Sequence, residues 1–103
     1  VAKIVPKCRP VGFGHFGDGN IHYNIAQPVD ADKAEFLSHW QDISEAVFDI
    51  IDALGGSISA EHGIGVMKRG DLAARADPVK MAMLRAVKTA LDPQGIMNPR
   101  VLV

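Results

Sequence analysis

The sequence has few of the features that mark secreted, membrane-spanning or nucleic-acid-binding proteins. Its one cysteine, Cys8, excludes an internal disulfide and fits a reducing compartment. No apolar run approaches the roughly 18 residues of a transmembrane helix. The formal net charge is −1 and the basic residues form no cluster, which argues against nucleic acid and anionic membranes as partners. We expect a cytoplasmic protein, or one that reaches a membrane only through parts outside this chain.

The composition that remains is that of a folded protein. The 103 residues fit one domain, and 48% of them are hydrophobic, which excludes a disordered chain. The chain starts at Val1 without a methionine, and we expect residues 1–103 to be the carboxy-terminal substrate-binding and catalytic segment of a longer protein.

Hydrophobic periodicity predicts strands first and helices later. Short strands are expected at Val11–Phe16, Asn20–Ala26 and Ser57–Ala60, and the second alternates between apolar and polar residues. A helix capped by Asp30 or Asp32 is expected to carry an apolar stripe from Phe36 to Leu54 and to stop at Gly55-Gly56. A weak helix around Met67–Arg75 and a last one opened by Asp77-Pro78 follow. This order predicts a small α+β fold, with a mainly antiparallel sheet packed with two main helices.

The first two strands bring two histidines together. If Asp18-Gly19 forms a two-residue hairpin turn, His15 lies directly opposite His22 on one face. Two imidazoles so placed can reach one metal ion, although a longer turn would break this pairing. Histidines paired with each other or with the backbone are the alternative, and spacing alone leaves the two about equal.

The second glycine-rich stretch supplies further candidates. Glu61 follows the strand expected at Ser57–Ala60, and a sheet that places this strand beside the hairpin would complete a His, His, Glu ligand set. Such a set is typical of catalytic zinc, with manganese, iron or cobalt also open. His62 is either a general base or a hydrogen-bonded loop residue.

The run Gly12–Gly17 matches the dinucleotide pattern G-x-G-x-x-G by letter only. That pattern binds pyrophosphate where a helix begins at the glycines, whereas a turn and a strand are expected here. We therefore reject a dinucleotide site in this chain.

Three stretches together resemble the carboxy-terminal domain of FAD-linked oxidases of the vanillyl-alcohol oxidase type. They are Gly14–His22, Ser59–Gly65 and Asp92–Pro99, in that order. The nearest branch looks like the D-lactate, glycolate and D-2-hydroxyglutarate dehydrogenases. The resemblance implies a ferredoxin-like substrate domain, with FAD bound mainly by a domain upstream.

The same resemblance implies roles for individual residues. His15, His22 and Glu61 match the ligands of a divalent metal, and His62 matches the base that takes the substrate's hydroxyl proton. Asn24 matches a substrate contact and Asn98 an asparagine near the flavin ring. The implied reaction is oxidation of a small 2-hydroxy acid to the 2-oxo acid, with hydride passing to FAD; the electron acceptor that follows is unknown.

The sequence departs from the family in its tail. The family usually continues Asn-Pro-Gly-Lys, whereas Asn98-Pro99 is followed here by Arg100-Val101, which puts the tail contact with flavin in doubt. The isolated segment is expected to be inactive and to pair with itself along an exposed sheet edge. Two alternatives stay open: a stand-alone metal-binding module or small metal-dependent hydrolase, and a non-catalytic structural domain.

Overall fold

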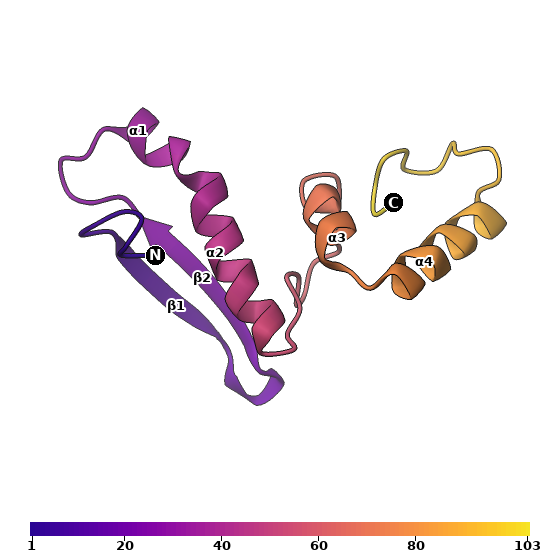
Figure 1. Cartoon of the computed structure of the whole chain (residues 1–103), viewed down its shortest axis with the longest axis horizontal. Coiled ribbons are helices and arrows are strands. Elements are labelled where there is room, and N and C mark those ends of the chain that lie inside the picture. Colours follow the sequence, from indigo (N-terminus) through magenta and orange to yellow (C-terminus); the bar gives the residue numbers. More distant parts are fainter. The chain divides into compact units, whose positions relative to one another are not determined.

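The chain folds into two compact units, which are described separately. A computed structural model describes all residues from Val1 to Val103. The amino-terminal unit comprises Val1–Ala60 and the carboxy-terminal unit comprises Glu61–Val103. The first holds a β-hairpin with helices α1 and α2, and the second holds helices α3 and α4 (Figure 1). The predicted α+β class is confirmed. None of the helices is both long enough and apolar enough to span a lipid bilayer.

The hairpin consists of β1 (Arg9–His15) and β2 (Asn20–Ala26), which form a two-stranded antiparallel sheet. The second strand has the predicted bounds, but the two-residue turn is wrong. A short 3-10 turn over Phe16–Asp18 and a left-handed Gly19 at φ 65° make the loop four residues long. The amide of Gly19 closes it by donating to the Phe16 carbonyl at 3.2 Å. Four-residue hairpin loops built on such a turn are common, so Asp-Gly does not by itself fix the loop length.

The longer loop changes the strand pairing by two residues. His15 lies opposite Asn20 and His22 opposite Phe13, so the predicted direct pairing of the two histidines is wrong. Side chains alternate between the faces of a strand, so a shift of two residues keeps them on the same face. His15 and His22 therefore still share a face, as diagonal neighbours.

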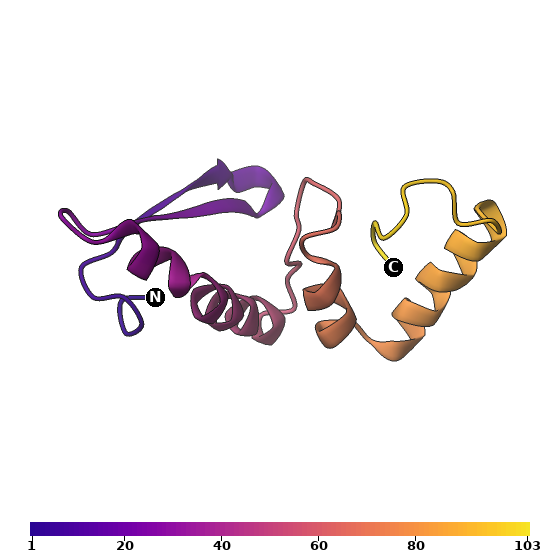
Figure 2. The ribbon, with the colours of Figure 1, turned by 90° about the horizontal axis from the view of Figure 1, so that it is seen from above.

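The other face of the hairpin lies over α1 (Lys33–Ser38) and α2 (Trp40–Ala53), as Figure 2 shows. Ile43, one of the few buried hydrophobic residues, lies on α2. The facing surfaces are apolar and enclose a pocket of about 300 Å³, lined by Tyr23, Asn24, Ile25, Phe36, Leu37, Trp40 and Ile43. The alternation predicted for the second strand thus places its apolar side toward the helices.

One continuous helix was expected up to Leu54, but the structure divides it at His39. In an α-helix the His39 amide would donate to the Glu35 carbonyl. The Ser38 hydroxyl instead donates to that carbonyl at 2.7 Å, and the His39 amide donates to the Phe36 carbonyl. Serine side chains that bond to the preceding turn in this way often bend helices.

The predicted ends of this helical region are confirmed. Asp32 caps α1 by accepting from the Glu35 amide at 2.8 Å. At the other end, Gly55 takes φ 69° and donates to the Asp52 carbonyl, while the Gly56 amide reaches the Ile51 carbonyl. This is the Schellman arrangement, which glycine at a left-handed position favours.

The strand predicted at Ser57–Ala60 is absent. The Ser57 hydroxyl donates to the Ser59 carbonyl at 3.0 Å and accepts from the Ser59 amide at 3.3 Å. Both backbone groups of Ser59 are thereby satisfied locally, so this segment bends instead of pairing with a neighbouring strand.

In the carboxy-terminal unit, α3 (Arg69–Arg75) and α4 (Pro78–Leu91) follow the predicted helices closely. Asp77 caps α4 by accepting from the Val79 amide at 2.7 Å, with Pro78 in the first turn as predicted. Leu72 and Met81 are buried.

Gly14 offers a test of the hairpin. A Cβ at this position would overlap the carbonyl oxygen of Asn20 and lie 3.0 Å from the Cα of Ile21. Gly14→Ala is therefore expected to lower the free energy of unfolding by about 1–3 kcal/mol, the usual cost of overpacking. Gly17→Ala is the matched control, because a Cβ there meets no atom within 4 Å. Thermal unfolding of both variants checks the prediction, and equal midpoints would contradict it.

Candidate functional site

The polar face of the hairpin carries three of the predicted site residues. His15, His22 and Asn24 share this face with Asn20 and Phe13. Diagonal neighbours on one face have Cα atoms about 7–8 Å apart, which is still within reach of long side chains. The hairpin thus presents two imidazoles on one face, and Asn24 also contributes to the lining of the pocket between the hairpin and the helices.

His22 stacks on Phe13, an interaction that the sequence analysis missed. The two ring centroids are 5.0 Å apart and the planes differ by 12°. The pair lies directly across the two strands, where an aromatic neighbour restricts the imidazole's orientation. Phenylalanine opposite histidine becomes visible only once the register is known, so the loop length was the missing information.

Glu61 and His62 lie in the carboxy-terminal unit, in an irregular segment before α3. Both are exposed. Because Ser57–Ala60 forms no strand, the route by which Glu61 was expected to join the histidines through the sheet is wrong. No group of three or more potential metal-binding side chains lies together within either unit. The roles of Glu61 and His62 stay predictions.

The segment with His62 is joined to the tail with Asn98. The Leu102 amide donates to the Gly65 carbonyl at 3.3 Å. Gly65 closes the Glu61–Gly65 stretch at φ 63°, and Leu102 lies four residues after Asn98. A backbone hydrogen bond therefore links the end of the second sequence motif to the residues that follow the third, within one unit.

Asp92 organises the loop between α4 and this tail. Asp92 is only 7% exposed, and its carboxylate accepts from the amides of Ile96 and Met97, each at 3.0 Å. The Lys88 ammonium donates to the same carboxylate at 2.8 Å and also to the Met97 carbonyl. The spacing of Lys88 and Asp92 by one helical turn is a signal for this pair that lies outside the chemistry of the three motifs.

The hydrogen bond from Lys88 lowers the pKa of Asp92 most, and the hydrogen bonds from the two backbone amides lower it further. Burial acts in the opposite direction, but the pKa stays below its usual value. A lowered pKa stabilises the fold above the usual aspartate pKa of about 3.9, and this contribution is lost as the pH falls through the lowered value. We expect urea unfolding of the wild type to show this loss below about pH 4. Asp92→Asn should be less stable at neutral pH and show a smaller loss on acidification. If Asp92→Asn loses as much stability on acidification as the wild type, the prediction is wrong.

Arg100 is the point at which the tail departs from the family resemblance. It stands where the family usually has glycine, and its φ of 67° is left-handed. This conformation costs a non-glycine residue about 1–2 kcal/mol. Replacement by glycine removes that cost but adds a smaller one, because glycine has the larger conformational entropy in the unfolded chain. Arg100→Gly is therefore expected to stabilise the tail by up to about 1 kcal/mol. Arg100→Ala removes the same charge and keeps the strain, so amide exchange at Leu102 should slow only in the glycine variant.

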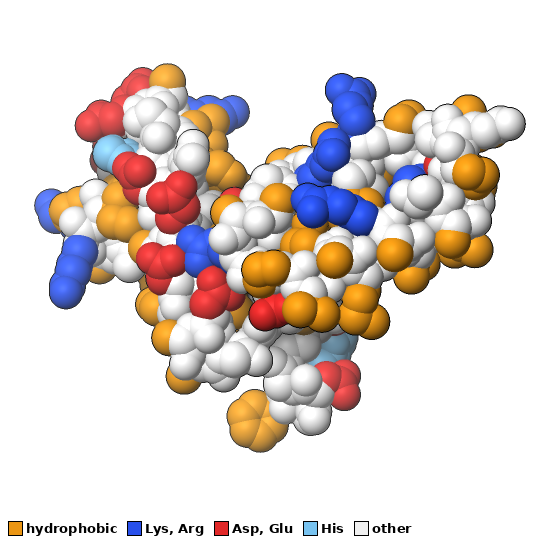
Figure 3. Space-filling view, turned by 45° about the vertical axis from the view of Figure 1, so that its right-hand side comes forward, with side chains coloured by type: hydrophobic (Ala, Val, Ile, Leu, Met, Phe, Trp, Pro, Cys, Tyr) orange, Lys and Arg blue, Asp and Glu red, His pale blue; other side chains and the backbone are white.

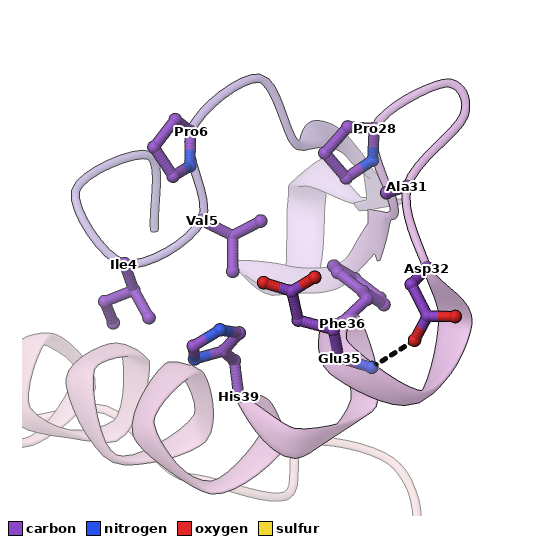
Figure 4. A pocket seen from close by; sticks show the side chains of 9 residues that line it. All are labelled: Ile4, Val5, Pro6, Pro28, Ala31, Asp32, Glu35, Phe36 and His39. Carbon is purple, nitrogen blue, oxygen red and sulfur yellow. Dashed lines mark hydrogen bonds between the residues drawn. The ribbon is translucent and has the colours of Figure 1, made fainter.

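A separate pocket lies in the amino-terminal unit and contains none of the predicted site residues. Its volume is about 280 Å³ and it is lined by Ile4, Val5, Pro6, Pro28, Ala31, Asp32, Glu35, Phe36 and His39. Figure 4 shows the Glu35 carboxylate and the His39 ring projecting toward the amino-terminal turn, with Asp32 engaged in capping α1. Its mixed lining offers no arrangement of acid, base and nucleophile.

The glycines of the first motif lie in a strand and a turn, as predicted. Gly12 and Gly14 lie within β1, and the chain passes through the loop into β2 without starting an α-helix. There is thus no helix amino terminus at these glycines to hold pyrophosphate.

Comparison with known proteins decides the family. A profile of the family described as FAD linked oxidases, C-terminal domain, matches residues 3–102. The chain belongs to this family. The resemblance predicted from the three motifs is confirmed.

Several relatives of this FAD-linked oxidase domain have named activities. The chain is 43% identical over 99 residues to a D-2-hydroxyglutarate dehydrogenase of Stutzerimonas stutzeri, covering 96% of this chain and 21% of that protein. It is 41% identical over 95 residues to a D-2-hydroxyglutarate–pyruvate transhydrogenase of Saccharomyces cerevisiae, covering 91% and 18%. It is 38% identical over 98 residues to the mitochondrial D-2-hydroxyglutarate dehydrogenase of Rattus norvegicus, covering 94% and 17%. The chain spans about a fifth of the length of these relatives.

Proposed function

We propose that this chain is the carboxy-terminal part of a flavin-dependent dehydrogenase that oxidises a small 2-hydroxy acid to the 2-oxo acid. D-2-hydroxyglutarate is the first candidate substrate, because the relatives named above act on it. The observation that carries the proposal is the match of residues 3–102 to the FAD-linked oxidase family, and it is supported by the hydrogen bond between Leu102 and Gly65. This bond joins the segment that holds the candidate base to the tail that holds the candidate flavin contact.

The exposed apolar surface supports a role as part of a longer protein. Large hydrophobic side chains lie open on the surface of both units (Figure 3), including fully exposed Phe16, Leu54 at 81% and Met67 at 87%. A two-stranded hairpin is marginally stable by itself, and both of its edges are unpaired here. We propose that other parts of the same protein cover these surfaces and bind most of the FAD.

The chemistry of the residues supports a division of roles. His62 accepts the proton of the substrate's 2-hydroxyl group at an imidazole nitrogen while the C–O bond becomes C=O. Asn24, on the polar face of the hairpin, donates a hydrogen bond to the substrate, and Asn98 lies beside the flavin ring. Bound flavin supplies the acceptor for the hydride that leaves Cα.

The proposal also includes a bound divalent metal ion. Two imidazole nitrogens and one carboxylate oxygen form a donor set that suits zinc first, and the hairpin already places two of the three on one face. His15, His22 and Glu61 would hold the ion, which would supply Lewis-acid polarisation of the substrate oxygens.

The test is reduction of flavin in the full-length protein. Anaerobic addition of D-2-hydroxyglutarate should bleach the visible flavin absorbance and yield 2-oxoglutarate. Glutarate, which lacks the 2-hydroxyl group, is the matched control and should leave the spectrum unchanged. D-lactate and glycolate measure how far the site accepts shorter acids. Absence of flavin from the full-length protein, or no bleaching by any of the hydroxy acids, would overturn the proposal.

A further inference from the structure

The loop after α4 contains more hydrogen bonds to its backbone than the turn that ends the helix requires. The turn itself is made by the Gly95 amide, which donates to the Asp92 carbonyl at 3.0 Å, and by Gly95 at φ 64°. The side chains of Asp92 and Lys88 act beyond this turn, on Ile96 and Met97. Their contacts therefore serve the segment that follows the helix.

The two charged groups together hold both backbone polar groups of one residue, Met97. Asp92 accepts from the Met97 amide, and Lys88 donates to the Met97 carbonyl. That carbonyl belongs to the peptide bond that leads into Asn98, so its orientation sets the direction in which the Asn98 backbone leaves the loop. Asp92 is almost fully buried, and its ion pair with Lys88 is consequently screened less than a surface pair.

Asn98 needs this support because its surroundings provide little. Its side chain is exposed and its φ of 45° lies in the left-handed region, which few non-glycine residues adopt. Neither burial nor regular secondary structure holds it. Its carbonyl accepts from the Val101 amide at 3.2 Å, and on its amino-terminal side the backbone is held by the contacts of Met97 with Asp92 and Lys88.

We infer that Lys88 and Asp92 are positioning residues, which hold the backbone carbonyl and amide of Met97 so that the Asn98 amide meets the flavin and substrate. This inference rests on the proposed function, which places Asn98 beside the flavin ring. It adds a role for two residues that touch neither ligand.

The experiment uses the full-length flavoprotein with Asp92→Asn, Lys88→Met, Asn98→Ala and the two double variants. Lys80→Met is the matched control, since Lys80 is an exposed lysine on the same helix. Amide exchange at Ile96 and Met97 should be faster in Asp92→Asn, which weakens the acceptor of both amides, and unchanged in the control. In both positioning variants kcat should fall about 10–100-fold, the cost of a small misplacement of an aligned group, while KM changes less than about threefold.

The double variants separate positioning from general destabilisation. If Asp92 and Lys88 act through Asn98, each double variant loses no more activity than Asn98→Ala alone. Additive losses, or faster exchange with unchanged kcat, would overturn the inference. Lys88→Met leaves Asp92 bonded to both amides, so it tests the same point if Asp92→Asn does not fold.

Flavin reduction in the wild-type protein shows separately whether the proposed function is wrong. If 2-hydroxy acids do not reduce its flavin, the positioning role falls with the function. If they do and the positioning variants behave like the control, only the positioning role is overturned.

Discussion

Replacing His62 by alanine in the full-length protein is expected to lower kcat about 10²–10⁴-fold, the range usually lost with a general base. The substrate's hydroxyl proton must leave as its Cα gives up a hydride, and His62 is the imidazole predicted to take it. Flavin content and substrate affinity should change little, because neither FAD nor the carboxylate is expected to be held by this side chain. Stopped-flow reduction of the flavin measures the step directly.

The control for this change is His39→Ala. His39 lies in the amino-terminal unit between α1 and α2 and lines the separate pocket there, so its loss should leave turnover within about twofold. Metal content should be measured in both variants, because loss of metal from the His62 variant would assign it to ligand binding instead. Normal turnover in His62→Ala would contradict the base role.

The elements with strong local signals were predicted from the sequence alone. The second strand was predicted with the bounds it has, because its alternation is uninterrupted and Pro28 follows closely. Asp77-Pro78 and Gly55-Gly56 marked helix ends for stereochemical reasons that do not depend on the rest of the fold.

The errors arose where a side chain competes with the backbone. The Ser38 hydroxyl donates to a carbonyl that would accept from a backbone amide in a continuous helix. The Ser57 hydroxyl bonds to the backbone of a segment that was expected to pair as a strand. Serine is compatible with both outcomes, and the apolar pattern around it is unchanged, so periodicity cannot distinguish them. The hairpin loop is a similar case, since Asp18-Gly19 suits turns of several lengths.

The candidate site was predictable in part for a geometric reason. The shared face of His15 and His22 survives the wrong loop length because an even shift in pairing preserves the alternation of side chains. The addition of Glu61 depended on a third strand, which is absent. Its place in the site stays a prediction from the family resemblance.

Replacing either hairpin histidine is expected to remove the metal from the full-length protein. Loss of a group that only orients a ligand usually weakens metal binding about 10–100-fold, so loss of a ligand should cost more than about 100-fold. His15→Ala and His22→Ala should therefore be purified nearly metal-free, and flavin reduction by the 2-hydroxy acid should slow in parallel with the metal content. Elemental analysis of the purified variants is the primary measurement.

Phe13→Leu is the control that separates metal binding from packing of the hairpin. It removes the ring stacked 5.0 Å from His22 but keeps both imidazoles on their face of the sheet. If the histidines are ligands, Phe13→Leu retains the metal while His22→Ala loses it. If they only pack against neighbours, metal content is the same in all three variants, and the metal part of the proposal is wrong. Treating the wild type with a chelator and adding back zinc, manganese or cobalt then identifies the ion, because the order of recovered activity reflects the preference of a His, His, Glu donor set.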